Sequence, residues 1–126
     1  MVNKIDFKKL VMFALEPNIV IKKIKEFCYH NFDILPINIA GHNVHFDISF
    51  IFKLLGNDFT KLFTHRAIDT ASILKYLYLS GKIPEDISSS EKAFKYFNII
   101  VENRHSALGD AKATALLFDK LVKLIK

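Results

Sequence analysis

The longest periodic stretch of the chain, from about Ala107 to Ile125, sets the strongest constraint on its fold. Apolar side chains recur there at the spacing of an α-helix, and lysines occupy the opposite side. The apolar stripe consists of Ala111, Ala115, Phe118, Leu121 and Ile125. A helix with one apolar stripe needs other elements to cover that stripe, so we expect a core built around this helix.

Shorter segments with helical spacing precede it. One begins at Pro17, a residue favoured in the first turn of a helix, and ends near residue 31. Two others run from about residue 44 to Gly56 and from about residue 70 to Gly81, where the glycines predict helix ends. Ser88 and Glu91 have the spacing of a capping box, which predicts a further helix to residue 97.

Two short apolar runs, residues 37–40 and 67–68, are predicted to be strands, and a third strand is expected near residues 99–101. Each of the first two runs is followed by a predicted helix. The sequence therefore predicts an α/β fold that is rich in helix, and the length of 126 residues predicts a single domain over residues 1–126.

Composition limits the class of protein. A hydrophobic fraction of 51% with twelve phenylalanines excludes a disordered chain. The longest apolar run, residues 10–15, is far shorter than a membrane span needs, so we expect no membrane association and an intracellular location, cytoplasmic or nuclear. The single cysteine, Cys28, has no partner for an internal disulfide. A net charge of +5 favours a polyanionic partner such as nucleic acid.

Two short motifs stand out: GHNVHFD at residues 41–47, called here the His42 motif, and HSALGD at residues 105–110, the His105 motif. In identity, order and separation they resemble the second and third acidic motifs of the DEDDh-type 3′-5′ exonucleases, which are DnaQ-like members of the ribonuclease H-like superfamily. Residues 68–70 also resemble that family, and the resemblance covers roughly residues 17–126. It implies a ribonuclease H-like fold.

The resemblance also implies roles for individual residues. Asp47 and Asp110 correspond to carboxylates that hold two divalent ions, Mg²⁺ or Mn²⁺, and His105 corresponds to the residue that takes a proton from the attacking water. Asn43 and Phe46 match positions that shape the substrate cleft. The implied reaction is hydrolysis of phosphodiester bonds at the 3′ end of single-stranded DNA or RNA.

The residue types leave alternatives open. Either aspartate alone is also explained by its favourable interaction with a helix N-terminus. Asn43 is equally suited to cap a helix and Phe46 to fill a core, and an aspartate before a helix, such as Asp69, is usually a cap. A zinc site formed by His42, His45 and Asp47 is disfavoured, because structural zinc sites have more soft ligands at characteristic spacings.

The first motif of the family, Asp-x-Glu on the opening strand, is missing, because no aspartate in the sequence has a glutamate two positions later. We therefore expect an N-terminally incomplete domain that is inactive alone and that lacks an N-terminal segment or an oligomer partner. Three explanations compete: a fragment of a working exonuclease, a non-catalytic relative that binds nucleic acid or protein, and coincidence.

Two structural expectations follow. If the resemblance reflects descent, Asp47 and Asp110 should converge on one side of the fold with His105 nearby. If sheet strands are missing, apolar side chains that would face them should be uncovered. Those side chains are expected to be Phe50, Ile51, Leu74, Phe118 and Leu121.

Overall fold

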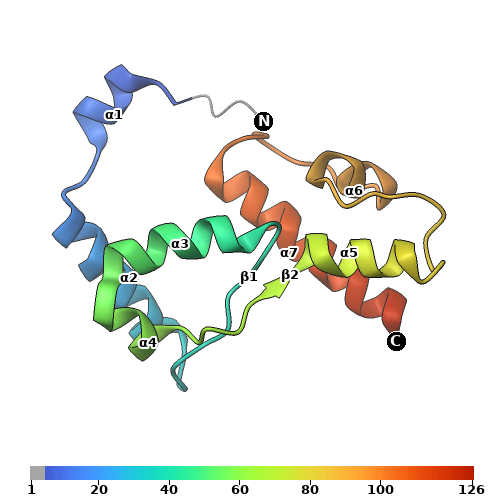
Figure 1. Cartoon of the computed structure of the whole chain (residues 1–126). Coiled ribbons are helices and arrows are strands. Elements are labelled where there is room, and N and C mark those ends of the chain that lie inside the picture. Colours follow the sequence, from blue (N-terminus) through green and yellow to red (C-terminus); the bar gives the residue numbers. More distant parts are fainter. Residues whose placement is uncertain (1–4) are drawn as a thin grey trace. The chain divides into compact units, whose positions relative to one another are not determined.

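The computed structural model describes residues 5–126, which are mostly helical (Figure 1). The elements are α1 (Phe7–Phe13), α2 (Pro17–Asn31), β1 (Ala40–Gly41), α3 (Val44–Leu55), the 3₁₀ turn η1 (Gly56–Asp58), α4 (Phe59–Leu62), β2 (Ile68–Asp69), α5 (Thr70–Leu79), α6 (Ser90–Tyr96) and α7 (Ala107–Ile125). They form two compact units. The N-terminal unit contains the residues up to 39 and 47–66, and the C-terminal unit contains 40–46 and 67–126.

The sheet of the C-terminal unit is small. Strands β1 and β2 run parallel, with Ala40 opposite Ile68 and Gly41 opposite Asp69. Both strands begin later than the sequence indicated, and the first is shorter. Ile37 forms only an isolated bridge with Phe63, in the N-terminal unit. The α/β expectation is thus met in part, by a mostly helical chain with a two-stranded parallel sheet in its described residues.

The third strand, expected near residues 99–101, is not formed in the described chain. This segment instead completes the end of α6. Asn98 adopts a left-handed conformation (φ 54°), and the Ile99 N–H donates to the Phe94 carbonyl at 2.8 Å. This hydrogen bond, from a residue to the carbonyl five positions earlier, is typical of a Schellman motif at a helix end. The Ile99 N–H is therefore not available to pair with a strand.

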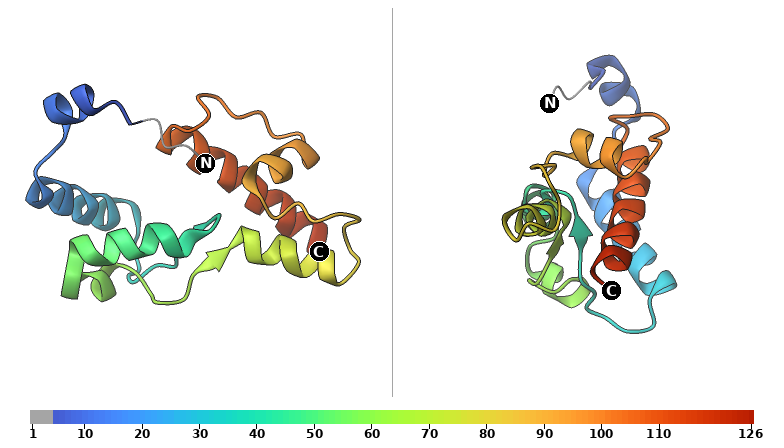
Figure 2. Two further views of the ribbon diagram at one scale, coloured as in Figure 1. Left: turned by 45° about the horizontal axis from the view of Figure 1, so that its top comes forward. Right: turned by 90° about the vertical axis from the view of Figure 1, so that its right-hand side faces the viewer.

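The core of the C-terminal unit lies between α5, α6 and α7, and α7 also packs against β1 (Figure 2). Its buried side chains are Leu74, Leu77, Ile83, Ile87, Ala93, Phe94, Ile99, Ala113, Leu117 and Leu121. The predicted bounds of α7 are confirmed, but the predicted stripe is largely wrong. Ala111, Ala115 and Ile125 are exposed, and the buried face follows Ala113, Leu117 and Leu121.

The core of the N-terminal unit gathers around Cys28 of α2, with Leu55, Phe59 and Leu62. The Cys28 side chain is buried, and burial raises the pKa of its thiol. At the surface of this unit, Lys25 contacts Asp58 at 2.7 Å.

Helix α1 has no buried residue. Its N-cap is Asp6, whose carboxylate accepts the backbone N–H groups of Lys8 and Lys9. The acid nearest the N-terminus therefore serves a helix rather than a strand.

Local signals predicted most helix starts. Pro17 occupies the first turn of α2, and Asp69 caps α5 by accepting the Ala71 N–H at 3.0 Å, as expected. The cap of α6 is displaced by one residue from the prediction. Ser89, not Ser88, accepts the Lys92 N–H, while the Ser88 hydroxyl donates to Asp86 at 2.6 Å.

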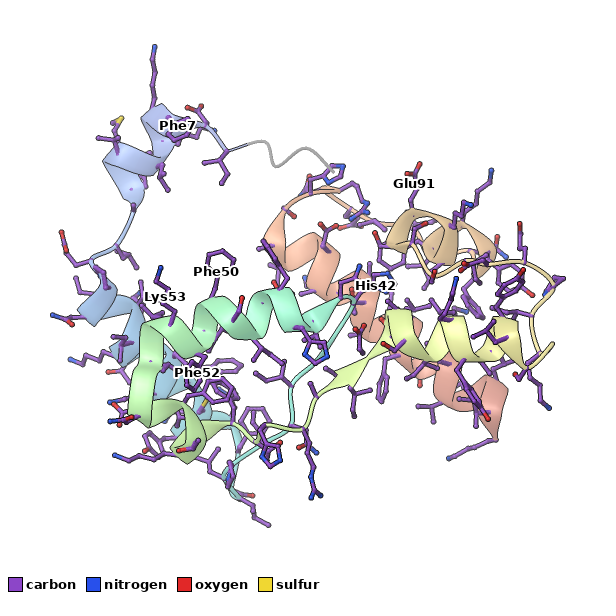
Figure 3. The ribbon with its side chains drawn as sticks, in the orientation of Figure 1. Phe7, His42, Phe50, Phe52, Lys53 and Glu91 are labelled. Atoms are coloured by element: carbon purple, nitrogen blue, oxygen red, sulfur yellow. The ribbon has the colours of Figure 1, made fainter. Side chains whose placement is uncertain are left out.

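The expectation of uncovered apolar side chains is met in part. Phe50 is 61% exposed on α3 (Figure 3), whereas Ile51 and Phe118 are half-buried. Leu74 and Leu121 are fully buried, so the expectation was wrong for them, because α5 and α7 cover each other. Among residues 5–126, no helix has the length and apolarity that crossing a membrane requires.

Candidate functional site

The carboxyl ends of the two parallel strands carry the first half of the candidate site. Residue Asn43 follows β1 in a left-handed conformation (φ 56°), and its backbone N–H donates to the Asp69 carboxylate at 2.9 Å. The same carboxylate oxygen accepts the Ala71 N–H at the start of α5. Asp69 therefore fixes the turn of the His42 motif onto α5, which gives this aspartate a structural role.

His42 directly follows β1, at the start of this turn (Figure 3). Its Nδ1 is 2.9 Å from the hydroxyl of Thr70, and that hydroxyl donates to the Gly41 carbonyl at 3.2 Å. A hydroxyl has one proton to donate, so the Nδ1 of His42 carries the hydrogen and donates to Thr70. Nε2 is buried and has no hydrogen-bond partner among the described residues.

The charge state of His42 follows from this environment. Burial lowers the pKa of its imidazole below the ordinary 6.5, and the positive charge of Arg104 acts in the same direction. The Ser88 backbone and the charge of Asp69 oppose this shift but do not cancel it. His42 is thus neutral at physiological pH and ties β1 to the start of α5.

The second half of the candidate site is the N-terminus of α7. Asp110, in the first turn, accepts a hydrogen bond from Arg104 Nη1 at 2.6 Å. Nη2 of the same guanidinium donates to the Ser90 hydroxyl at 2.9 Å, and its carbon lies 5.3 Å from the centre of the Phe94 ring. Arg104 therefore connects α6 to the first turn of α7 through a charged pair that is roughly one-third exposed.

His105 adopts a left-handed conformation (φ 73°) directly before α7. Its backbone N–H donates to Asp110 Oδ1 at 3.3 Å, while the residue as a whole is exposed. Ser106 caps the helix by accepting the Gly109 N–H at 3.1 Å. A depression of about 430 Å³ beside this loop is lined by Glu91, Phe94, Lys95, Ile99, Val101, Arg104 and His105.

The structure brings together part of the predicted site. His105 and Asp110 are in contact, and Asn43 belongs to the same unit. Asp47 is exposed in the first turn of α3 and belongs to the N-terminal unit, so its convergence with Asp110 stays a prediction. Phe46 is 69% exposed, which makes the interpretation as a core residue wrong and leaves a role in substrate binding as a prediction.

The two predicted ion ligands, Asp47 and Asp110, belong to different units, so a divalent-ion site that uses both stays a prediction. Within the described part of the chain, no three His, Cys, Asp or Glu side chains gather as ion ligands. Asp110, one of the two predicted ligands, already has a cationic partner in Arg104. Ions of the Mg²⁺ type prefer several oxygen ligands on rigid elements, a requirement that one paired carboxylate does not meet.

Sequence reasoning missed Arg104 and the role of His42. Arg104 directly precedes the His105 motif, but its partners Ser90 and Phe94 lie on another helix, so spacing gave no signal. His42 was considered only as a zinc ligand. The short polar residue Thr70, two positions after the strand predicted at residues 67–68, was the one available signal for its partner.

The chain is similar to segments of PolC-type DNA polymerase III from several bacteria. The chain is 33% identical over 106 residues to the PolC-type DNA polymerase III of Listeria welshimeri, with 84% of this chain and 7% of that protein covered. The PolC-type enzyme of Clostridium perfringens is 34% identical over 89 residues, covering 70% of this chain and 6% of the polymerase. The chain is similar to a short segment of a DNA polymerase. No family model and no solved structure matches it significantly.

Proposed function

We propose that this chain is an exonuclease-related domain that binds the 3′ end of single-stranded DNA and does not cut it unaided. The observation that supports the proposal is that both motifs contribute residues to the C-terminal unit: His42 follows β1 and bonds to Thr70, and Asp110 lies in the first turn of α7 and pairs with Arg104. The similarity to segments of PolC-type DNA polymerase III supports a role on nucleic acid, DNA as the substrate and an intracellular location.

The proposal of a ribonuclease H-like fold of the DEDDh type rests on the same motifs. In that family four carboxylates hold two divalent ions, and this sequence offers Asp47 and Asp110 without the Asp-x-Glu pair. Because Asp110 is also paired with Arg104, we propose that substrate binding is retained and that hydrolysis is absent in this chain. Asn43 and Phe46 are the proposed contacts to the terminal nucleotide.

The activity test uses the full chain with 5′-labelled single-stranded DNA and RNA, in Mg²⁺ or Mn²⁺. We expect no shortening from the 3′ end, because half of the carboxylates are missing. The matched variants are Asp110→Asn and His105→Ala. Shortening that both variants abolish would contradict the proposed inactivity, and shortening that survives both would show that the assigned residues are wrong.

The binding test measures fluorescence anisotropy of a single-stranded DNA oligonucleotide over a range of salt concentrations. We expect affinity to fall as salt rises, because a chain with net charge +5 releases counterions from the phosphates that it contacts. Phe46→Ala should weaken binding at every salt concentration, since stacking on an exposed aromatic ring contributes about 1–3 kcal/mol per base. Absence of measurable binding to DNA would favour the alternative, a non-catalytic relative that binds protein.

A further inference from the structure

We propose that Arg104 is a built-in cation that takes the place of a divalent ion at Asp110. The proposal concerns how this chain keeps its α7 terminus ordered, and it does not depend on whether the chain binds DNA. It starts from a disagreement: the resemblance assigns Asp110 to a metal ion, whereas the described structure pairs Asp110 with a side chain.

Several contacts fix the position of the Arg104 guanidinium. One guanidinium nitrogen meets Asp110 at 2.6 Å and the other meets Ser90 at 2.9 Å. The Phe94 ring lies 5.3 Å from the guanidinium carbon, within the range of cation–π attraction. Three partners on α6 and α7 thus fix a planar cation whose fork geometry suits carboxylates.

Oδ1 of Asp110 is shared between two donors. It accepts Arg104 Nη1 and also the backbone N–H of His105 at 3.3 Å. This arrangement holds His105 in its left-handed conformation against the first turn of α7. In a nuclease that depends on ions, a divalent cation would supply the positive charge for this carboxylate. Here the chain supplies that charge itself, so the turn is ordered without an ion.

Two cations compete for one carboxylate. A divalent ion that approaches Asp110 meets the positive charge of Arg104 at short range and must displace it to gain the Oδ1 lone pairs. The structure therefore assigns Arg104 as a positioning residue that orders the His105 motif and lowers the affinity of Asp110 for divalent ions. Removing the guanidinium should create the weak ion site that the wild-type chain lacks.

The experiment titrates the full chain with Mn²⁺ alone and follows free Mn²⁺ by electron paramagnetic resonance. Wild-type protein and Asp110→Asn should bind Mn²⁺ equally weakly. Arg104→Gln should bind about tenfold more tightly, and the double variant Arg104→Gln with Asp110→Asn should return to the wild-type affinity. Arg104→Lys keeps a cation but loses the planar fork, so its Mn²⁺ affinity should lie between those of wild type and Arg104→Gln.

Lys95→Gln is the matched control, because Lys95 lines the same depression and its loss removes one positive charge without touching Asp110. Its Mn²⁺ affinity should stay within about twofold of wild type. An Arg104→Gln protein that binds no tighter than Lys95→Gln would overturn the proposal. Wild-type binding that Asp110→Asn abolishes would overturn it too.

A second variant keeps the test decisive if Arg104→Gln does not fold, which far-ultraviolet circular dichroism would reveal. Ser90→Ala removes one hydrogen bond from the guanidinium and leaves the charge in place. The loosened arginine should release Asp110 more often, so Mn²⁺ affinity should rise about two- to threefold. An unchanged Mn²⁺ affinity in Ser90→Ala would then show that Arg104 and the ion do not compete for Asp110. No nucleic acid is present in these titrations, so their outcome is separate from that of the DNA-binding test.

Discussion

The hydrogen bond of His42 to Thr70 joins the residue after β1 to the start of α5. Thr70 is itself completely buried, and its hydroxyl donates a hydrogen bond to the Gly41 carbonyl. Protonating His42 would place a second hydrogen on Nε2, which is buried without a hydrogen-bond partner among the described groups. The cost of burying that positive charge connects a single side chain to the stability of the C-terminal unit.

Stability should therefore depend on pH through His42. Burial depresses the pKa of His42 in the folded state below the unfolded value of 6.5, so the unfolded chain binds the proton more readily. The contribution is complete above pH 6.5 and is lost as pH falls toward the folded pKa. His42→Gln should flatten the fall in melting temperature between pH 7 and pH 5. His45→Gln, at an exposed position, should leave that fall unchanged, and a pH profile that His42→Gln does not alter would contradict the assignment.

Gly109 is a second residue whose role depends on close packing. A Cβ at this position would lie 2.3 Å from the Glu102 carbonyl oxygen and 2.8 Å from that of Asn103. Both neighbours are backbone atoms of the loop that leads to His105, so relief requires movement of the loop itself.

Alanine at Gly109 should therefore have the opposite effect from the usual one. In an ordinary helix interior the change from glycine to alanine stabilises by about 1 kcal/mol. Here the contact with backbone carbonyls should make Gly109→Ala destabilising by about 1–3 kcal/mol, measured by urea denaturation. Lys112→Ala, on the exposed side of the same helix, should change stability by less than about 0.5 kcal/mol. A Gly109→Ala protein as stable as wild type would show that the loop can move without cost.

At the scale of the elements, helix boundaries were readable from the sequence because their signals are local. Pro17 marks α2, and the start and end of α7 match the prediction. The strands were read less well, since two-residue strands exist only through pairing between distant segments. The buried face of α7 was misjudged because apolar residues such as Leu116, Leu117 and Phe118 are consecutive, and only packing against α5 and α6 selects Leu117.

In the candidate site too, contacts between residues close in sequence were predictable and contacts between distant residues were not. Contact between His105 and Asp110 is close in sequence and was predictable from their spacing. The pairing of Arg104 with Ser90 was not, because the two residues come from a loop and a separate helix. Contacts between side chains of different elements do not produce a regular spacing in the sequence, so they cannot be predicted from periodicity.

The cap of α6 provides a test at this scale. Ser89 accepts the Lys92 N–H, so Ser89→Ala should destabilise the chain by about 0.5–2 kcal/mol, or lower the melting temperature by about 2–8 °C. Ser88 was the predicted cap, but its hydroxyl donates to Asp86 in the preceding turn instead. Ser88→Ala should loosen that turn and keep α6 intact. Hydrogen exchange of the Lys92 amide distinguishes the two variants, because only Ser89→Ala should speed it. Faster exchange at Lys92 in Ser88→Ala than in Ser89→Ala would restore the original prediction.

At the scale of the whole molecule, the main feature is apolar surface left in contact with water. Helix α1 exposes Phe7 at 75%, Val11 at 84% and Phe13 at 71%, and Phe50 and Phe52 of α3 are exposed as well (Figure 3). A groove of about 490 Å³ in the N-terminal unit is lined almost entirely by apolar side chains. Many large apolar side chains exposed together favour association with another surface.

The chain should therefore self-associate at micromolar concentration and bind the dye 8-anilinonaphthalene-1-sulfonate. Covering a few hundred Å² of apolar surface at ~25 cal/mol per Å² stabilises by several kcal/mol, which is comparable to the stability of a small domain. Replacing Phe7, Val11 and Phe13 together by serine should reduce dye fluorescence and shift sedimentation toward the monomer, without loss of helix signal because α1 buries no residue. Leu74→Ala is the contrasting variant: Leu74 is fully buried, so its truncation should instead lower stability by about 2–5 kcal/mol. A wild-type chain that sediments as a monomer, binds no dye and unfolds in one sharp transition would show that this surface tolerates water without a partner.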